Sequence, residues 1–146
     1  MTDTRLPHDH GQSIEKELDQ MPGAEVFQTA ADIFKQLGDG NRVRIFWILC
    51  HCEECVINIA SMVGMSSPAV SHHLKQLKAG HLITSRRSGK EMYYKAAETE
   101  QAQLLHHVIE QIVQVACLSK TDGELRLRGY LYGGGKADRD QVRCGD

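Results

Sequence analysis

The segment from Met65 to Lys78 limits the fold of this chain more than any other stretch of its sequence. It consists of Met-Ser-Ser-Pro-Ala-Val-Ser-His-His-Leu-Lys-Gln-Leu-Lys. Ser67 can cap the start of a helix, and Pro68 suits the first helical turn, where its missing N–H costs no hydrogen bond. Three apolar residues then follow at the spacing of one helix face: Val70, Leu74 and Leu77. The segment therefore predicts a helix that rests on a core through a narrow apolar stripe and presents a polar face.

A second short helix is expected directly before this segment. Residues 56–63 are mostly apolar and are followed by Gly64, which suits a tight turn. Two helices joined in this way form a helix-turn-helix, whose second helix enters the major groove of DNA. The side chains that could hydrogen-bond to phosphates or base edges are Ser66, Ser67, Ser71, His72, Lys75, Gln76 and Lys78. The alternative is a pair of packed surface helices without DNA contact, since any amphipathic pair can show this pattern.

A β-hairpin is predicted after the two helices. Residues 82–87 and 91–96 are β-prone runs separated by Ser88-Gly89-Lys90, a composition typical of hairpin turns. Arg86, Arg87 and Lys90 lie at or beside the tip, where a wing contacts the DNA backbone. Residues 66–96 contain six Lys and Arg residues and one acid, a local charge of +5, whereas the whole chain has a formal net charge of −2. Helix, hairpin and charge together favour a winged-helix surface for nucleic acid over a merely solvated basic face.

The other predicted elements indicate how the chain is organised. Residues 1–22 are expected to form a flexible N-terminal arm with a short helix inside residues 13–20. Residues 23–120 should form one mainly α-helical winged-helix domain with a small β-hairpin wing and long helices near 24–37, 40–50 and 98–118. The first and last long helices carry apolar faces that a small core does not need, so we expect a homodimer through these two helices. Residues 121–146 are expected to form a poorly ordered tail.

Composition argues against several classes of protein. The chain is 41% hydrophobic and 25% charged, as is ordinary for a soluble globular domain. It has no apolar run long enough for a membrane span and no signal-peptide core, so we expect a cytoplasmic protein without membrane contact. It shows no phosphate-binding glycine loop and no nucleophile beside a base, so we expect neither an enzyme nor a small organic substrate. In a reducing compartment, the five cysteines indicate metal binding or thiol chemistry rather than disulfides.

Three of these cysteines lie close together, at the junction between two predicted helices. Cys50, Cys52 and Cys55 fall within six residues, and three thiolates can converge on one soft ion. His8 and His10 on the N-terminal arm could supply the further ligands that zinc, cadmium or lead would need, while three thiolates alone would satisfy arsenite. The alternative is that one or more of these cysteines simply pack in the core.

A second, weaker candidate metal site is expected on the last helix. Its ligands would be Glu98, Glu100, His106, His107 and Glu110. His106 and Glu110 are four residues apart and share a helix face, and an antiparallel dimer could bring such sets from two chains together. Imidazole and carboxylate ligands of this kind suit zinc, nickel or cobalt. A His–Glu pair on a solvated helix face accounts for the same spacing without a metal.

Four stretches of the sequence form a wider pattern. They are Leu37 to Phe46, Glu54 to Ala60, Ser67 to Leu77 and Arg87 to Tyr94, within about residues 24–118. Together they resemble the ArsR/SmtB family of metal-sensing repressors. The resemblance implies a homodimeric winged helix that binds double-stranded operator DNA without its ion and releases the DNA when the ion binds. It also implies that the controlled genes encode efflux or detoxification.

The metal-ligand positions of that family are matched in part. Where its cadmium, lead and zinc sensors have a Cys-x-Cys pair, this chain has Cys55-Val-Ile57. Cys50, Cys52 and Cys55 have the Cys-x-Cys-x-x-Cys spacing of its arsenic sensors but begin earlier in the motif. On the last helix, acids match the first ligand pair of its zinc sensors and amides occupy the second: Glu98 and Glu100, then Gln111 and Gln114.

We therefore expect a transcriptional repressor that releases its operator when a soft or borderline metal ion binds. The sequence leaves two alternatives open. The clustered thiols could form a reversible disulfide, which would make the protein a redox-sensing repressor. The chain could also be a constitutive DNA-binding module with a structural metal, which should unfold when the metal is chelated.

Overall fold

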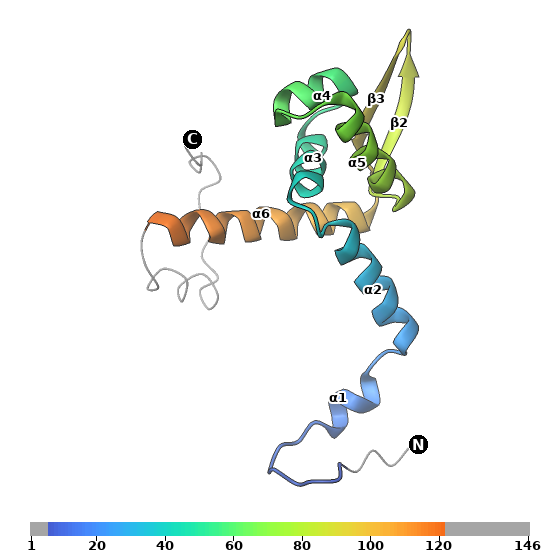
Figure 1. Ribbon diagram of the computed structural model, residues 1–146. Helices are drawn as coiled ribbons and strands as arrows, with labels where there is room; N and C mark the ends of the chain where they lie inside the picture. The colour runs from blue at the N-terminus through green and yellow to red at the C-terminus, as the bar shows by residue number, and fades with distance from the viewer. Residues whose placement is uncertain (1–5, 122–146) are drawn as a thin grey trace.

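A computed structural model describes residues 6–121 of the chain, and the side-chain surroundings of residues 6–117. Along this part the chain is mainly helical, with one small antiparallel sheet (Figure 1). The elements in chain order are α1 (Glu15–Gln20), α2 (Ala24–Gln36), α3 (Gly40–His51), β1 (Glu54–Cys55), α4 (Val56–Val63), α5 (Ser67–Ala79), β2 (Ile83–Ser88), β3 (Glu91–Ala96) and α6 (Glu100–Thr121). This is the predicted winged helix-turn-helix. The predicted C-terminal tail falls outside the described residues from 122 onward.

The turn between α4 and α5 follows from two local signals. Gly64 ends α4 in the left-handed region with φ of 67°, which glycine adopts without steric cost. Ser66 then caps α5, because its hydroxyl accepts a hydrogen bond from the backbone N–H of Ala69 at 3.3 Å. The prediction that Ser67 is the cap was wrong by one residue, since Ser67 is already the first residue of the helix. Pro68 lies in the first turn, as expected.

The hairpin that follows α5 is regular. Strands β2 and β3 pair antiparallel from Ile83 with Ala96 to Ser88 with Glu91, which leaves a two-residue turn. Gly89 has φ of 62° at the first position of that turn, where two-residue hairpins favour glycine. The sequence did not predict β1, which adds a short third strand by pairing Glu54 with Tyr94 and Cys55 with Tyr93. Strand β1 therefore joins the cysteine-rich segment to the middle of β3.

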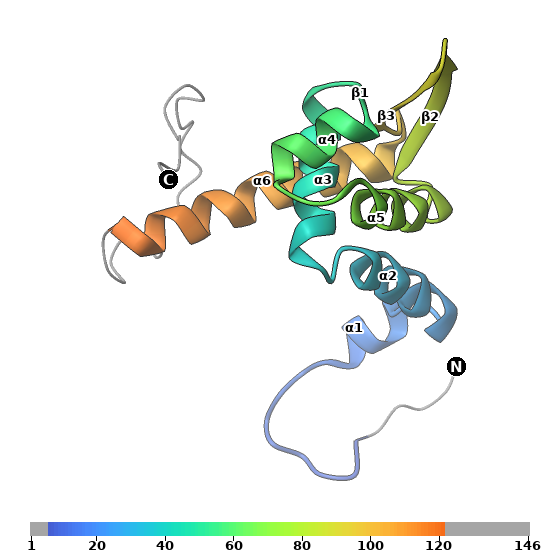
Figure 2. The ribbon, with the colours of Figure 1, turned by 45° about the horizontal axis from the view of Figure 1, so that its top comes forward.

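The core lies where α3, α4, α5, the start of β2 and the first half of α6 meet (Figure 2). The large side chains buried most completely are Phe46, Ile45, Leu49, Ile59, Leu74, Leu77, Leu82, Ile83 and Val70. The apolar stripe predicted for α5 is thus buried, as its spacing indicated. Trp47 of α3 is 40% exposed and packs against His51, whose ring in turn contacts His106 of α6. Burial of these side chains is the main favourable term that holds α3, α4 and α5 together.

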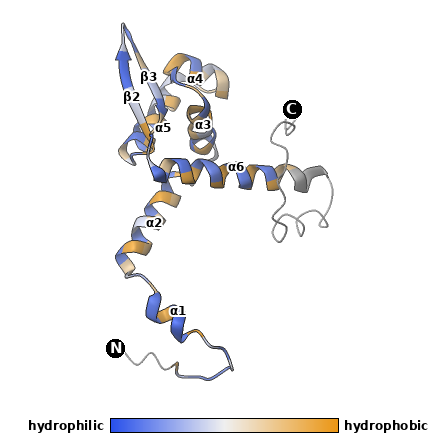
Figure 3. Cartoon of the chain, turned by 180° about the vertical axis from the view of Figure 1, so that it is seen from behind, coloured by the Kyte–Doolittle hydropathy of each residue, from blue (hydrophilic) through white to orange (hydrophobic). Residues whose placement is uncertain are grey.

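Helices α2 and α6 extend away from this core, and both expose apolar side chains (Figures 1 and 3). On α2 the exposed apolar residues include Val26, Phe27 and Phe34, the last of which is 68% exposed. On α6 they are Leu104, Val108, Ile112 and Val113, while Leu105 and Ile109 on its other side are buried. Exposed apolar surface of this kind marks an interaction site or a membrane contact. Yet none of the helices among residues 6–121 is both long and apolar enough to span a bilayer.

Candidate nucleic-acid interface and metal cluster

Helix α5 has a buried face and an accessible polar face, as its sequence predicted. Its apolar stripe packs into the core, and this fixes the direction of the opposite side chains. Ser66, Ser71, His72, Lys75 and Lys78 are exposed, and Ser67 and Gln76 are half-buried. These seven residues therefore lie on one accessible side of the molecule, at the beginning and along the length of α5. The hairpin stands beside the same helix (Figure 1).

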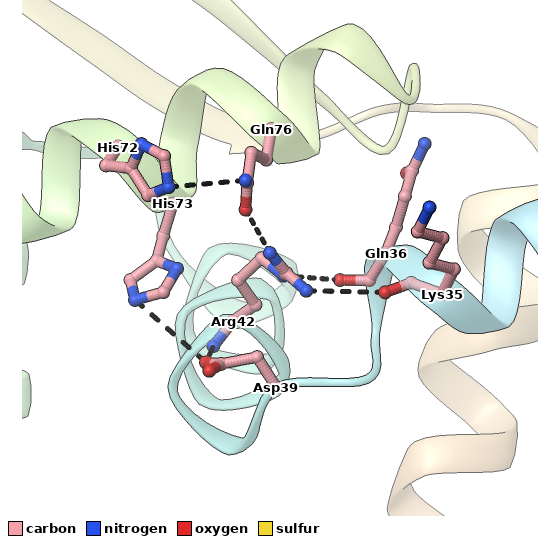
Figure 4. A network of polar contacts seen from close by, with 7 residues as sticks. All are labelled: Lys35, Gln36, Asp39, Arg42, His72, His73 and Gln76. Carbon is pink, nitrogen blue, oxygen red and sulfur yellow. Dashed lines mark hydrogen bonds and ion pairs between the residues drawn. The ribbon is translucent and has the colours of Figure 1, made fainter.

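A network of hydrogen bonds holds part of this polar face in place (Figure 4). The guanidinium of Arg42 on α3 donates to the side-chain oxygen of Gln76. It also donates from Nε to the backbone oxygen of Gln36 at 2.6 Å and from Nη2 to that of Lys35 at 3.3 Å. On its other side, the Gln76 Nε2 lies 3.2 Å from the Nε2 of His72. Arg42 therefore connects the end of α2 to a side chain on the outer face of α5, a role that sequence reasoning missed.

Asp39 supports the same network from the start of α3. Its carboxylate caps the helix by accepting the backbone N–H of Arg42 at 3.0 Å. The Nε2 of His73 lies 3.9 Å from this carboxylate, and the buried Nδ1 of His73 has no hydrogen-bond partner among the residues that the structure describes. The hydrogen bond from Arg42, and to a smaller extent the charge of His73, hold the pKa of Asp39 below its usual value. Asp39 is therefore a stable anion between α3 and α5.

The basic residues of the hairpin differ in their surroundings. Arg86 donates from Nε to Glu53 at 2.8 Å and lies over the ring of Tyr93, 5.1 Å from its centre. The hydrogen bond from Arg86 lowers the pKa of Glu53, and Glu53 in turn raises the pKa of Arg86. By contrast, Arg87 and Lys90 are exposed and make no ion pair within residues 6–117. Arg87 and Lys90 are therefore the hairpin cations with the greatest freedom to contact a phosphate, whereas Arg86 is tied to the segment before β1.

One further lysine links the helix to the hairpin. Lys78, near the end of α5, donates from Nζ to the hydroxyl of Ser85 on β2 at 2.6 Å. Lys75, one turn earlier, is exposed and makes no ion pair within residues 6–117. Helix and hairpin thus form one surface with a shared hydrogen bond. The charge of +5 counted from the sequence belongs to residues 66–96, and two of these cations pair with acids outside that range: Arg86 with Glu53 and Lys95 with Glu98.

The three clustered thiols lie in different surroundings. Cys50 is half-buried near the end of α3, Cys52 is half-buried and its Sγ lies 3.4 Å from the backbone oxygen of Ile48, and Cys55 is buried. Burial, followed by the negative charge of Glu110, raises the pKa of Cys50 to about 12. Burial and the charge of Glu54 also raise the pKa of Cys52. Within the part of the chain that the structure describes, these thiols are not members of a group of three converging ligand atoms.

The two histidines of the N-terminal arm are exposed. Their rings are stacked on each other with centres 6.1 Å apart. They precede α1, which lies far from α3 and the thiols in the single chain (Figure 1). His8 and His10 therefore do not meet Cys50, Cys52 and Cys55 within this one chain.

A different set of metal-ligating side chains does converge: His51, His106 and Glu110. The Nε2 of His51 lies 3.3 Å from Glu110 Oε1, the Nε2 of His106 lies 2.9 Å from the same oxygen, and the two nitrogens are 3.2 Å apart. Sequence reasoning placed His106 and Glu110 on one face of the last helix, but it did not include His51 among the candidate ligands. Contact between the end of α3 and α6 unites them, and no local spacing signals that contact.

The other candidate ligands on the last helix do not join this converging set within the described residues. Glu98 pairs with Lys95 at 3.1 Å, and His107 lies 3.0 Å from Gln111 through its Nε2. Glu100 is exposed in the first turn of α6. Beside the converging set is a pocket of about 330 Å³, which is lined by His51 and His106 together with Cys50, Cys52, Glu53 and Glu98 among others.

Known proteins are similar to this chain in both sequence and fold. A family model described as "Bacterial regulatory protein, arsR family" matches residues 39–85. The chain is 32% identical over 87 residues to the HTH-type transcriptional regulator KmtR of Mycobacterium tuberculosis, a match that covers 60% of this chain and 66% of that relative. It is 30% identical over 117 residues to the arsenic resistance transcriptional regulator ArsR2 of Pseudomonas putida, covering 80% of this chain and 98% of that relative.

Among solved structures, one similar to this chain is the winged helix-turn-helix domain of Mb0332 from Mycobacterium bovis. It is described as a homodimeric DNA-binding domain of a possible ArsR-family transcriptional regulator. The similarity has a TM-score of 0.55 at 31% sequence identity and covers 70% of this chain and 94% of that one. The residues matched by the family model span α3 to α5 and the first residues of β2, and so include the helix of the candidate interface.

Proposed function

Because this chain belongs to the ArsR family of bacterial regulatory proteins, we propose that it is a repressor that binds operator DNA as a homodimer and releases it when a metal ion binds. The family and the similar proteins are transcriptional regulators, so the protein is not an enzyme. The observation that carries the DNA-binding role is the exposed polar face of α5 beside two free hairpin cations, Arg87 and Lys90. Helix α5 enters the major groove, and the hairpin contacts the neighbouring phosphates.

The exposed apolar faces of α2 and α6 support the homodimer. A folded chain in water gains stability when such faces are buried against each other, at about 25 cal/mol per Å². Mb0332, which shares the fold, is itself described as homodimeric. A two-fold dimer places two copies of α5 about 34–36 Å apart, the spacing at which they meet successive major grooves. The operator is accordingly a near-palindrome.

The metal response is supported by the side chains of metal-ligand type that lie close together near the end of α3. One relative is named for arsenic resistance, and this chain offers two ligand sets. The thiol set is Cys50, Cys52 and Cys55, completed by His8 and His10 of a partner chain, and it suits zinc, cadmium, lead or arsenite. The imidazole and carboxylate set on α3 and α6 suits a borderline ion such as zinc, nickel or cobalt. A coupling of about 1–3 kcal/mol between ion and DNA is enough for regulation.

Operator affinity measured with and without metal tests this proposal. Fluorescence anisotropy with the duplex upstream of the protein's own gene gives the dissociation constant of the metal-free protein. Adding zinc, nickel, cobalt, cadmium, lead or arsenite in turn should raise that constant about 5-fold to 150-fold for the cognate ion. Indifference to all six would contradict the metal response. A metal-free protein that is unfolded by circular dichroism would favour the alternative with a structural metal.

A further inference from the structure

We propose that His51, His106 and Glu110 form a metal site within a single chain, and that a borderline divalent ion bound there locks α3 to α6. The regulatory part of this inference rests on the proposed function, whereas the binding part does not. The site differs from the thiol set and from an intersubunit site on the last helix, because all three ligands come from one chain. Its ligand atoms are two imidazole nitrogens and one carboxylate oxygen, a set suited to zinc, nickel and cobalt.

The distances among the three ligand atoms match one face of a metal coordination polyhedron. An ion held about 2.1 Å from nitrogen and oxygen ligands requires those atoms to be about 3.4 Å apart in a tetrahedral site and about 3.0 Å apart in an octahedral one. The three distances in the protein are 2.9, 3.2 and 3.3 Å. An ion can therefore reach all three atoms with little movement of the side chains.

A cation can take the place of the protons through which the two rings would otherwise bond to Glu110. With Nε2 unprotonated on both rings, the three ligand atoms are all acceptors and can all face one ion. One proton can be shared between only two of the three atoms, whereas a metal ion can bind all three at once. His51, His106 and Glu110 are partly exposed, so an ion can enter from solvent and keep water in its remaining positions.

The position of the cluster connects the two functional parts of the molecule. His51 is the last residue of α3, and the chain continues through β1 directly into α4 of the helix-turn-helix. His106 and Glu110 lie on α6, whose exposed apolar residues form part of the proposed dimer interface. An ion that joins the three side chains fixes the angle between the DNA-binding unit and the dimer helix. A fixed angle that separates the two copies of α5 by the wrong distance lowers operator affinity.

The only tryptophan of the chain gives a direct readout. The ring of Trp47 packs against His51 with centres 4.4 Å apart. Paramagnetic Co²⁺ bound at His51 should quench the fluorescence of Trp47 and give visible d–d absorption. We expect a saturable titration with one Co²⁺ per chain for the full-length protein. His106→Gln and Glu110→Gln are the informative variants, because neither residue contacts Trp47 in the way that His51 does.

The expected result is a loss of Co²⁺ affinity of at least about 10-fold in both variants, comparable to the removal of groups that orient metal ligands. His107→Gln is the matched control, since it makes the same substitution one residue away, on a side chain that pairs with Gln111. Cys52→Ser tests the thiols in the same way. Unchanged affinity in His107→Gln and Cys52→Ser would support the site. Unchanged affinity in His106→Gln and Glu110→Gln, or a loss in Cys52→Ser, would overturn it.

Operator affinity of the same variants separates this inference from the proposed function. If His106→Gln binds the operator normally without metal and no longer releases it with Co²⁺, the cluster is the regulatory site. If Co²⁺ binds at the cluster without changing operator affinity, the regulatory part is wrong and the binding part stands. If the metal-free wild-type protein does not bind its operator, the proposed function fails, and the fluorescence titration still decides whether the cluster binds metal.

Discussion

Arg42 on α3 donates a hydrogen bond to the side-chain oxygen of Gln76, 34 residues later on the outer face of α5. The same guanidinium contacts the backbone oxygens of Gln36 and Lys35 at the end of α2. The orientation of a side chain assigned to DNA contact is therefore tied to the end of a helix assigned to dimerisation. A change in how α2 packs in the dimer has a direct physical route to the DNA-binding face.

This link predicts that Arg42 and Gln76 are energetically coupled in operator binding. Arg42→Ala removes the donor that holds the side-chain oxygen of Gln76, and Gln76→Ala removes the same contact while Arg42 keeps its hydrogen bonds to the end of α2. We expect a double-mutant cycle of operator dissociation constants for the two single variants and the double variant to give a coupling of at least about 0.5 kcal/mol. Additive effects of the two substitutions would show that the contact does not position Gln76 for DNA.

The free hairpin cations predict a specific salt dependence. Arg87→Ala and Lys90→Ala should each weaken operator binding by a similar factor for every DNA sequence. Each should also reduce the slope of log affinity against log salt concentration by about 1, because one phosphate contact is lost. Lys35→Ala on α2 is the control, since its side chain is exposed and α2 extends away from the hairpin (Figure 1). A slope unchanged in both hairpin variants would exclude phosphate contacts by the wing.

The exposed apolar face of α2 predicts a dimer that one charged substitution can dissociate. Phe34→Glu places a carboxylate in the proposed interface, and burial of an unpaired charge is strongly unfavourable. Light scattering should then report the 16.3 kDa monomer with the helical content of the wild type. Ile57→Glu on α4 is matched in exposure, at 66% against 68% for Phe34, and should remain dimeric. A wild-type protein that is monomeric at micromolar concentration would contradict the proposed assembly.

The raised pKa values of the thiols predict slow thiol chemistry. Thiolates, not thiols, react with peroxide and alkylating agents, and a pKa of about 12 for Cys50 leaves very little thiolate at neutral pH. We expect iodoacetamide to modify Cys50 in the folded, metal-free protein at least about 100-fold more slowly than in guanidinium-unfolded protein. Tandem mass spectrometry measures both rates. Rapid modification of Cys50, together with loss of operator binding after peroxide, would instead favour the redox-sensing alternative.

Local signals were sufficient to predict most of the fold. Pro68, the apolar spacing of α5 and the alternation around Gly89 each belong to one segment, so the helix-turn-helix and the hairpin were correct from sequence. The adjacent Ser66 and Ser67 are chemically equivalent as caps, and only the backbone of the folded chain selects Ser66. Strand β1 has two residues, too few to show any alternation.

The candidate sites depended more on contacts between distant segments. Glu53 holds Arg86 across 33 residues, and His51 meets His106 across 55 residues. Neither pair has a periodic spacing that a sequence reveals. The exposure of Trp47 has the same origin, since its ring rests on His51 at the side of α3 that α6 covers only in part. Composition indicated ligand-type side chains, and the fold determines which of them meet.

The most direct measurement is a titration of one fluorescent duplex from the protein's own promoter and one scrambled duplex of equal length with metal-free protein at a fixed salt concentration. If two copies of α5 contact bases in successive major grooves, two chains bind each promoter duplex, and its affinity exceeds that of the scrambled duplex by at least about 10³-fold. Equal affinity for both duplexes, or one chain per duplex, would contradict operator recognition by this protein.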